Sequence, residues 1–318
     1  MIVKKAVVVV LVAAMTPPVF AWGPLGHRIV AETAALLVAD DLPATWGPLI
    51  ARHRFELGVY AYLPDARFRY IDGASGRVEA PTHYLNLDGP ADGAPRDGTV
   101  DRRVAQFLEL AASQLKDVRA PTGGYQRGAT ATGDARRVYL GLYDLGVMSH
   151  YSGDAAMPYH ATSNFNGYSG GEGGIHFYFE SDCVNALEPG LATEVLAAAR
   201  KNRTRWLRSW KFDPNRPVQL VAAVLEDSLA AVATVSELDR RHAVTKLQPP
   251  GSRLNAERRP ATLGCRAMRP LLVDRLARGA VLTAALWTSV LPTDVDFSGA
   301  SALEFSDMEL AADYVAPP

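Results

Sequence analysis

The sequence has few cysteines, almost no net charge and no repeated segment. Two cysteines in 318 residues exclude a small disulfide-stapled scaffold, and the absence of a CxxC motif excludes a thiolate zinc finger or a thioredoxin-like redox motif. The 33 basic and 34 acidic residues give a formal net charge of −1, so there is no general basic field for nucleic acid. With 48% apolar and 21% charged residues, the chain has the composition of an ordinary globular protein rather than of a disordered one.

The N-terminal segment has the pattern of a secretory signal peptide. Two lysines precede the apolar run Ala6 to Ala14, and Val19-Phe20-Ala21 offers a cleavage site of the small-residue type. This run is too short to span a bilayer as a helix, and no later apolar stretch of about 18 residues is evident. A buried N-terminal strand is the alternative interpretation. We expect residues 1–21 to be removed, the mature chain to begin at Trp22, and the protein to be secreted or periplasmic.

Past Trp22 the apolar spacing is mostly helical. Apolar side chains recur every three to four residues in four segments, and residues 138–148 are apolar on nearly all sides, as in a central buried helix. Alternating patterns typical of strands are scarce, and no connection is long enough to separate two domains. The sequence therefore predicts one all-α, multi-helix domain over residues 22–318. The four helical stripes are Leu25, Ile29, Val30, Thr33 and Leu37; Val104, Leu108, Ala111 and Leu115; Val221, Val224, Leu225, Ser228, Val232 and Val235; and Val273, Leu276, Ala280, Thr283 and Trp287.

Cys183 and Cys265 are the only cysteines in the sequence. In an oxidising compartment they can join two helical regions by one disulfide, and a pair of free buried thiols is the alternative. The sequence leaves both open.

Two HxxxD/E pairs with a third histidine between them form the main candidate site. In each pair the two side chains are four residues apart, so on a helix they project within about 40° of each other. Pro158 ends or kinks the first helix, which lets the middle histidine return toward the same cavity. Buried imidazoles and carboxylates are costly unless something compensates them, and together they form a zinc-binding set. The residues are His150, Asp154, His160, His176 and Glu180.

Four residues upstream are further candidates. Asp65 directly follows a proline, and His83 lies in a short extended segment or the first turn of a helix. The predicted mature start places the amine of Trp22 five residues before His27, and a free amine with its carbonyl oxygen can chelate a metal.

Other charged segments are interpreted as surface. His53 and His242 are flanked by arginines and are predicted to be surface residues. The basic residues between 200 and 208, near Trp206 and Trp210, predict a solvated helix face. Docking of that face to anionic lipid headgroups or nucleic acid is the alternative.

Taken in order, the candidate residues resemble those of the trinuclear zinc phosphodiesterases, the superfamily of bacterial zinc-dependent phospholipase C and S1/P1-type nucleases. The resemblance runs from Trp22 to about Glu180. It rests on a Trp followed by a His, an Asp, a lone His, then HxxxDxxxxxH and HxxxE. It implies an all-α domain of the phospholipase C/P1 nuclease type and a zinc-dependent phosphoric diester hydrolase that binds three Zn²⁺ ions.

The same resemblance implies a role for each candidate. Asp65 and Asp154 would be the catalytic residues, and Asp65 could act as a general base instead of as a ligand. Arg67 could help to neutralise the phosphate, although nucleases of this family have an arginine three rather than two residues after the Asp. The implied ligands are Asp65, His83, His150 and Asp154 for one zinc; His160, His176 and Glu180 for a second; and the amine and carbonyl of Trp22 with His27 for a third, which Asp154 bridges to the first.

The sequence carries marks of both branches of the superfamily. Glu180 in HxxxE and the stretch 154–166 resemble the phospholipases, whereas the short spacing from the first Trp to the first His resembles the nucleases. Tyr84 and Asn86 occupy places where nucleases hold a base, by stacking and by hydrogen bonding. We favour a phospholipase C that cleaves glycerophospholipids to diacylglycerol and a phosphorylated headgroup. A single-strand-preferring nuclease is the alternative, and a non-enzymatic zinc-binding secreted protein is the minor one.

The partners expected on this basis are few. The substrate would be a phospholipid or a single-stranded nucleic acid, with peripheral membrane contact in the first case. We expect a monomer with no obligate protein partner.

Overall fold

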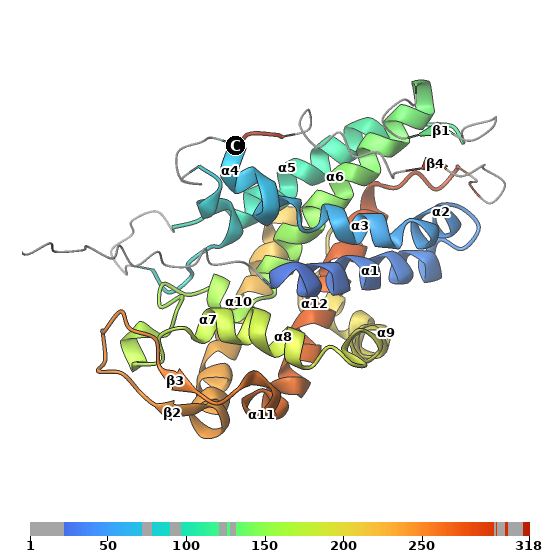
Figure 1. Ribbon diagram of the computed structural model, residues 1–318. Helices are drawn as coiled ribbons and strands as arrows, with labels where there is room; N and C mark the ends of the chain where they lie inside the picture. The colour runs from blue at the N-terminus through green and yellow to red at the C-terminus, as the bar shows by residue number, and fades with distance from the viewer. Residues whose placement is uncertain are drawn as a thin grey trace, which may run out of the picture.

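The computed structural model describes residues 22–71, 78–89, 97–120, 126–127, 132–295, 297, 303–304 and 314–318. The predicted signal peptide, residues 1–21, lies outside the described residues. Helices dominate, as the all-α prediction requires, and Figure 1 shows them packed into one bundle. In chain order the elements are α1 (Gly23–Asp41), α2 (Gly47–Arg52), α3 (Arg54–Tyr60), η1 (Pro64–Phe68), α4 (Arg69–Ile71), η2 (Ala80–His83), α5 (Val100–Leu115), β1 (Gln126–Arg127), α6 (Gly133–Ala155), η4 (Pro158–His160), η5 (Tyr168–Gly170), α7 (Ile175–Phe177), η6 (Tyr178–Asp182), α8 (Cys183–Ala186), α9 (Leu191–Ser209), α10 (Pro217–Leu238), η7 (Asp239–Ala243), β2 (Val244–Lys246), β3 (Glu257–Arg258), α11 (Ala261–Gly264), η8 (Arg266–Met268), α12 (Arg269–Val290) and β4 (Leu303–Glu304).

The central helix is α6, whose residues from 141 to 155 are all buried. It packs along α5 and also contacts α1, α3, α10 and α12. Gly146 allows the close approach of α3, because a Cβ at this position would lie 2.7 Å from the Cβ of Tyr60. The segment 138–148 thus forms the buried helix that its composition predicts.

Helices from the C-terminal half fix the end of α6. The hydroxyls of Ser152 and Thr283 lie 2.6 Å apart, which ties α6 to α12. Ser228 of α10 donates a hydrogen bond of 2.7 Å to the carbonyl of Ala155. Because these hydroxyls are buried and paired, they specify how α10 and α12 sit against the last turns of α6.

Strands are short and few in the described segments, as predicted. β1 pairs with β4 in parallel, and β2 pairs with β3 as an antiparallel hairpin. The hairpin lies against the segment 166–174, since the amides of Gln248, Gly251 and Ala256 donate to the carbonyls of Gly171, Tyr168 and Gly173 at 3.0, 2.8 and 2.8 Å.

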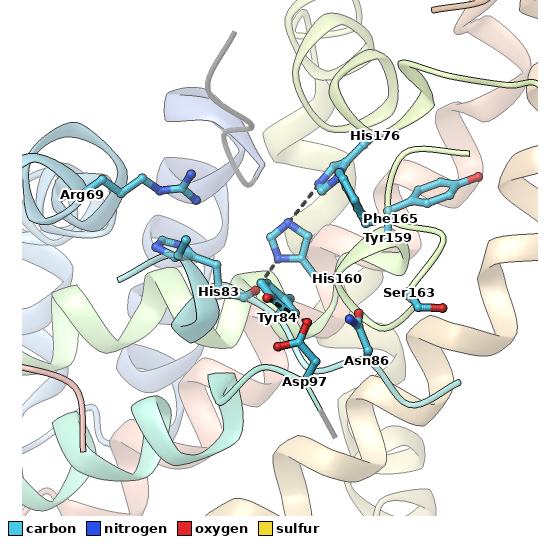
Figure 2. Close-up of a pocket in the computed structure, with 11 residues that line it drawn as sticks. Arg69, His83, Tyr84, Asn86, Asp97, Tyr159, His160, Ser163, Phe165 and His176 are labelled. Carbon is cyan, nitrogen blue, oxygen red and sulfur yellow. Dashed lines mark hydrogen bonds between the residues drawn. The ribbon is translucent and has the colours of Figure 1, made fainter. Parts of the chain in front are cut away.

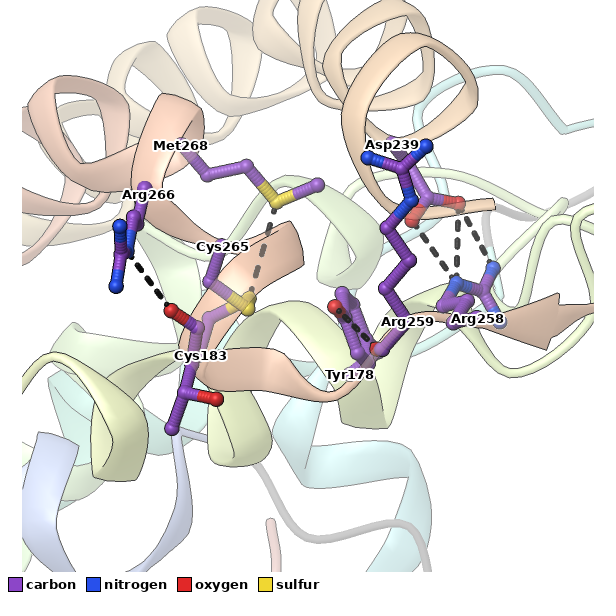
Figure 3. The surroundings of a disulfide bond; sticks show 9 residues. Tyr178, Cys183, Asp239, Arg258, Arg259, Cys265, Arg266 and Met268 are labelled. Carbon is purple, nitrogen blue, oxygen red and sulfur yellow. Dashed lines mark hydrogen bonds and ion pairs between the residues drawn. A yellow bond between two sulfur atoms is a disulfide. The ribbon is translucent and has the colours of Figure 1, made fainter. Parts of the chain in front are cut away.

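Cys183 and Cys265 form a disulfide with a Cα–Cα distance of 5.2 Å (Figure 3). The bond joins the start of α8 to the residue after α11, positions separated by 82 residues. This settles the choice between a disulfide and free thiols, and it is compatible with an oxidising compartment. Because α8 directly follows η6, the disulfide also fixes the chain next to Glu180.

The segment 217–243, formed by α10 and η7, is long and apolar enough to cross a membrane by length and composition alone. Its presence corrects the expectation that no later apolar stretch of that length exists. A third of its most apolar window is buried, and α10 packs on α5, α6 and α12. α10 therefore packs one face on the bundle, while most of its apolar window is not buried.

The prediction that His53 is a surface residue is wrong, whereas the prediction of a solvated basic face on α9 gains support. His53 is buried at the corner between α2 and α3, although arginines flank it in the sequence, whereas His242 is half-buried. On α9, Arg200 pairs with Asp40 at 2.8 Å, and Trp206 is buried. The basic face of α9 is therefore partly neutralised by α1, and its tryptophans belong to the core.

The burial of His53 predicts a measurable contribution to acid sensitivity. Burial, with a smaller effect of Arg52, lowers the pKa of His53 from 6.5 to about 4. Between these values the unfolded chain binds the proton and the folded chain does not, so stability falls as pH drops from about 6.5 to 4. His53→Gln should reduce this loss, by up to about 3 kcal/mol. Urea unfolding of both metal-free proteins across this range would measure it, and parallel pH profiles would contradict it.

Candidate metal centre

The nine residues singled out as ligands come together in the middle of the bundle. All nine are 0–3% exposed, although most are ionisable. Two of the three π-helical turns in the described residues carry a candidate acid, Asp65 in η1 and Glu180 in η6. Such turns are rare and are frequent at functional sites. Pro158 follows the end of α6 and opens η4, so that His160 turns back toward the cavity, as expected.

Four of these residues form the first group. The Nδ1 of His83 lies 2.9 Å from the Nε2 of His150 and 3.0 Å from the Oδ2 of Asp154. The Oδ1 of Asp65 is 3.9 Å from His83 Nδ1 and 4.0 Å from His150 Nε2. The His150–Asp154 spacing of four residues gives a 3.3 Å approach on α6. The structure therefore brings together the four residues expected to hold one zinc.

Trp22 and His27 lie beside this group. The Nε2 of His27 is 3.5 Å from the Oδ1 of Asp154 and 4.0 Å from the Oδ2 of Asp65. The buried indole of Trp22 donates to the carbonyl of Gly153 at 2.7 Å, and the backbone of Trp22 hydrogen-bonds Glu180. The expected start of the mature chain thus lies at the centre of the site.

His160, His176 and Glu180 form the second group. The two Nε2 atoms of His160 and His176 are 3.0 Å apart, and the Oε2 of Glu180 is 2.9 Å from His176 Nε2 and 3.8 Å from His160 Nε2. A separation of more than about 10 Å between the two histidines would have excluded a shared metal. The groups are joined, because Asp154 Oδ1 is 3.8 Å from His160 Nδ1.

Backbone groups orient three of these rings. His150 Nδ1 donates to the carbonyl of Ala61 at 2.8 Å, and His160 Nδ1 donates to the carbonyl of His83 at 2.5 Å. The backbone of Phe165 hydrogen-bonds His176. A proton held on Nδ1 leaves the lone pair of Nε2 directed into the site, which is the arrangement found for metal-ligating histidines.

Burial shifts the pKa of seven of these side chains toward the neutral form. It raises the pKa of Asp65 to about 7, against the opposing effects of His150 and Arg69. It lowers the pKa of His150 to about 4 and that of His176 to about 3. In the same way the pKa of Asp154 and of Glu180 is raised, and that of His83 and of His160 is lowered.

The donor set fits divalent cations. Three groups of three residues each have ligand atoms within 4.8 Å of one another: His27, Asp65 and His150; His83, His150 and Asp154; and His160, His176 and Glu180. In the group of His160, His176 and Glu180, two imidazole nitrogens and a carboxylate oxygen lie 2.9–3.8 Å from one another. A cation would compensate these lone pairs and the buried carboxylates. Imidazole and carboxylate ligands without thiolate suit zinc.

A cavity of about 430 Å³ opens on both groups (Figure 2). It is lined by His83, His160 and His176, together with Tyr84, Phe165 and other residues. Arg69, rather than Arg67, lines it and contacts the Oδ1 of Asp65 through its Nε at 2.9 Å. The sequence analysis missed Arg69, although its i, i+4 spacing from Asp65 is the signal that could have found it.

The buried ion pair of Arg103 and Glu79 stabilises the turn that ends at His83. Arg103 is fully buried and donates to the Oε1 of Glu79 at 3.0 Å, and Tyr151, the neighbour of His150, donates to the same oxygen. Thr82 donates to the carbonyl of Glu79 at 2.7 Å, which closes the turn that ends at His83. No motif in the sequence indicates this pair, because 24 residues separate its members.

Comparisons with known proteins give distant structural likenesses and no match in sequence. No protein-family model matches the chain, and no curated protein matches it in sequence. Among solved structures it is similar to the alpha-toxin of Clostridium perfringens from an avian strain, with a TM-score of 0.40 and 12% identity. The match covers 83% of this chain and 62% of the toxin, so the chain spans less than two thirds of the toxin's length. A likeness at this level carries no argument about activity. What the structure defines is an all-α protein with buried His, Asp and Glu clusters that can bind metal.

Removal of Arg103 should be costly, because it leaves the buried carboxylate of Glu79 without its cation. Arg103→Met is expected to lower the free energy of unfolding by about 3–5 kcal/mol. Arg103→Met combined with Glu79→Gln should recover at least half of that loss. As a matched control, Arg241→Met breaks an exposed pair with Glu237 and should cause no measurable change. Denaturant titration of the metal-free proteins measures all three, and equal stability of Arg103→Met and wild type would contradict the account.

Proposed function

We propose that this protein is a secreted zinc-dependent phosphodiester hydrolase, a phospholipase C that acts on glycerophospholipids. The observation that supports it is a cavity lined by Arg69 and by members of two of the three His/carboxylate groups, His83 of one and His160 and His176 of another. A structural zinc site is closed by four protein ligands, whereas the group of His160, His176 and Glu180 offers three beside an open cavity. This difference favours an enzyme over a non-enzymatic zinc-binding protein.

In this proposal the residues hold three Zn²⁺ ions. Asp65, His83, His150 and Asp154 bind one, His160, His176 and Glu180 bind another, and His27 with the freed amine and carbonyl of Trp22 binds the third. When bound, zinc supplies Lewis-acid polarisation of phosphoryl oxygens and lowers the pKa of coordinated water. Arg69 neutralises phosphate charge at the cavity wall. Asp65, in contact with Arg69, is either a ligand or the acceptor of a proton.

The cavity favours a phospholipid headgroup over a polyanion. Figure 2 shows Arg69 on one side of His83 and Asp97 on the other. The hydroxyl of Tyr84 donates to the Oδ2 of Asp97 at 3.2 Å, so a carboxylate lies beside an aromatic ring in the cavity. A carboxylate repels neighbouring phosphates of a nucleic acid strand, whereas with an aromatic ring it attracts a cationic headgroup.

A single-strand-preferring nuclease is the second candidate. Tyr84 and Asn86, which the resemblance places at a base-binding position, both line the cavity. A base could stack on the ring of Tyr84 and bond to the amide of Asn86.

The decisive assay offers phosphatidylcholine and single-stranded DNA side by side to the zinc-loaded mature protein. We expect hydrolysis of the lipid, and loss of turnover by at least a thousandfold in His150→Ala, because that change removes a metal ligand. His242→Ala, a half-buried histidine away from the site, should retain full activity. Cleavage of DNA alone would replace the phospholipase proposal by the nuclease. Hydrolysis that persists after chelation by EDTA or phenanthroline would contradict the metal mechanism itself.

Signal-peptide cleavage is expected to complete the site. Before cleavage the nitrogen of Trp22 is an amide and a poor ligand, whereas the free amine has a pKa of about 7.7–8.0 and can bind zinc. The backbone of Trp22 already lies at Glu180, so little movement is needed. A protein with one glycine added before Trp22 should therefore bind one zinc fewer than the protein that begins at Trp22, and should lose most turnover.

Both proteins are incubated with excess zinc and passed through gel filtration, and their zinc content is measured. The result distinguishes a zinc-binding amine at Trp22 from a tryptophan whose indole only packs. If both proteins retained the same zinc content and the same rate, the amine would not be a ligand.

A further inference from the structure

Six of the eight exposed large apolar side chains in the described part of the chain lie in or next in sequence to the cavity-lining residues, or on the hairpin that packs against residues 166–174. Phe165 lines the cavity, and Phe177 follows the lining residue His176 in the sequence. Tyr70 follows the lining residue Arg69, and Val78 lies two residues before the lining residue Ala80. The six are Tyr70, Val78, Phe165, Phe177, Leu247 and Leu254. These six side chains are called the rim. Its cavity-lining part and its hairpin part meet at Tyr168, whose ring lies 6.1 Å from the ring of Phe165 and 5.7 Å from the guanidinium of Arg253.

The most exposed part of this rim is the tip of the β2–β3 hairpin, residues 246–254. Leu254 is 65% exposed and Leu247 is 45% exposed, and the residues between them include Pro249 and Pro250, both exposed. Figure 1 shows this hairpin projecting from the body of the protein beside the segment that connects η4 to α7. Both leucines of the tip thus leave about half or more of their surface in contact with solvent.

The charges of the tip are basic. Lys246, Arg253 and Arg259 are exposed on the hairpin, and its only acid, Glu257, is held by Lys246 at 2.9 Å. The guanidinium of Arg253 lies 5.7 Å from the ring of Tyr168, so it is placed next to the cavity-bordering segment. Leucines flanked by cations are the combination that binds an anionic lipid interface.

The base of the hairpin is firmly held. Arg258 donates to Asp239 at 2.8 Å and to the carbonyls of Glu172 and Gly173 at 2.7 and 2.9 Å. Together with the three backbone hydrogen bonds described above, these contacts join the hairpin to the segment that leads into His176. A surface that binds the tip is therefore held at a fixed distance from the cavity.

We propose that the hairpin tip docks on the surface of a bilayer that contains anionic lipids and thereby sets the cavity mouth against the membrane. Leu247 and Leu254 enter the boundary between headgroups and acyl chains, while Arg253 contacts lipid phosphates. The proposal rests on the phospholipase function, for which a lipid must leave the bilayer and enter the cavity. Single-stranded nucleic acid is a less suitable occupant, because the tip offers no aromatic side chain on which bases could stack.

The test measures binding separately from catalysis. The full mature protein is sedimented in EDTA with sucrose-loaded vesicles of phosphatidylcholine, with and without 30% phosphatidylglycerol at about 0.1 M salt. We expect at least tenfold tighter binding to the anionic vesicles, and at least a tenfold loss in the double variant Leu247→Ser/Leu254→Ser. Phe55→Ser, which changes an equally exposed aromatic on α3, is the matched control and should bind like wild type.

Activity then distinguishes the two proposals. The zinc-loaded double variant should hydrolyse a monomeric short-chain phosphatidylcholine at the wild-type rate but lose at least tenfold on vesicles. If wild type fails on the monomeric lipid, the phospholipase function is wrong, whereas vesicle binding still reports on the tip. Equal vesicle binding by wild type and the double variant, or equal binding of wild type to neutral and anionic vesicles, would overturn the docking proposal. Loss of single-stranded DNA binding in Arg253→Glu with unchanged vesicle binding would overturn it as well.

Discussion

Burial of many ionisable side chains in one place is the constraint on which this structure depends. Five imidazoles and three carboxylates share the centre of an apolar bundle, where the charged form of each is disfavoured by the loss of water. Mutual hydrogen bonds satisfy only part of the set, because nitrogens such as the Nε2 atoms of His160 and His176 face each other. The arrangement is consistent with a protein that is complete only with cations, and the surrounding helices are built to hold that arrangement.

The supporting structure works through backbone geometry more than through side chains. Carbonyls of Ala61 and His83 fix the rings of His150 and His160, and π-helical turns place Asp65 and Glu180. A π turn inserts one residue into a helix and so rotates the side chains that follow it. The buried pair of Arg103 and Glu79 then holds the turn that ends at His83. Each device is local, and together they bring candidate ligands from seven elements to one centre.

Spacing within single helices made much of the site predictable. His150 with Asp154, and His176 with Glu180, meet because residues four apart share a helix face, and the effect of Pro158 follows from its fixed backbone. His53 was misjudged because neighbouring arginines in a sequence say nothing about a corner between two helices. The Arg103–Glu79 pair, the cavity and the position of the hairpin depend on contacts between distant segments, which no local pattern encodes.

The two halves of the chain make different contributions to the candidate centre. All candidate ligands lie between residues 22 and 180, yet α10 and α12 pack on the last turns of α6 and supply the hydroxyls of Ser228 and Thr283. A ribosome or a translocation pore releases the half that carries these residues first, with nothing yet to enclose them. The candidate centre therefore takes its final form late, when α10 and α12 dock on α6, and any metal it holds would be enclosed in the compartment where those helices dock.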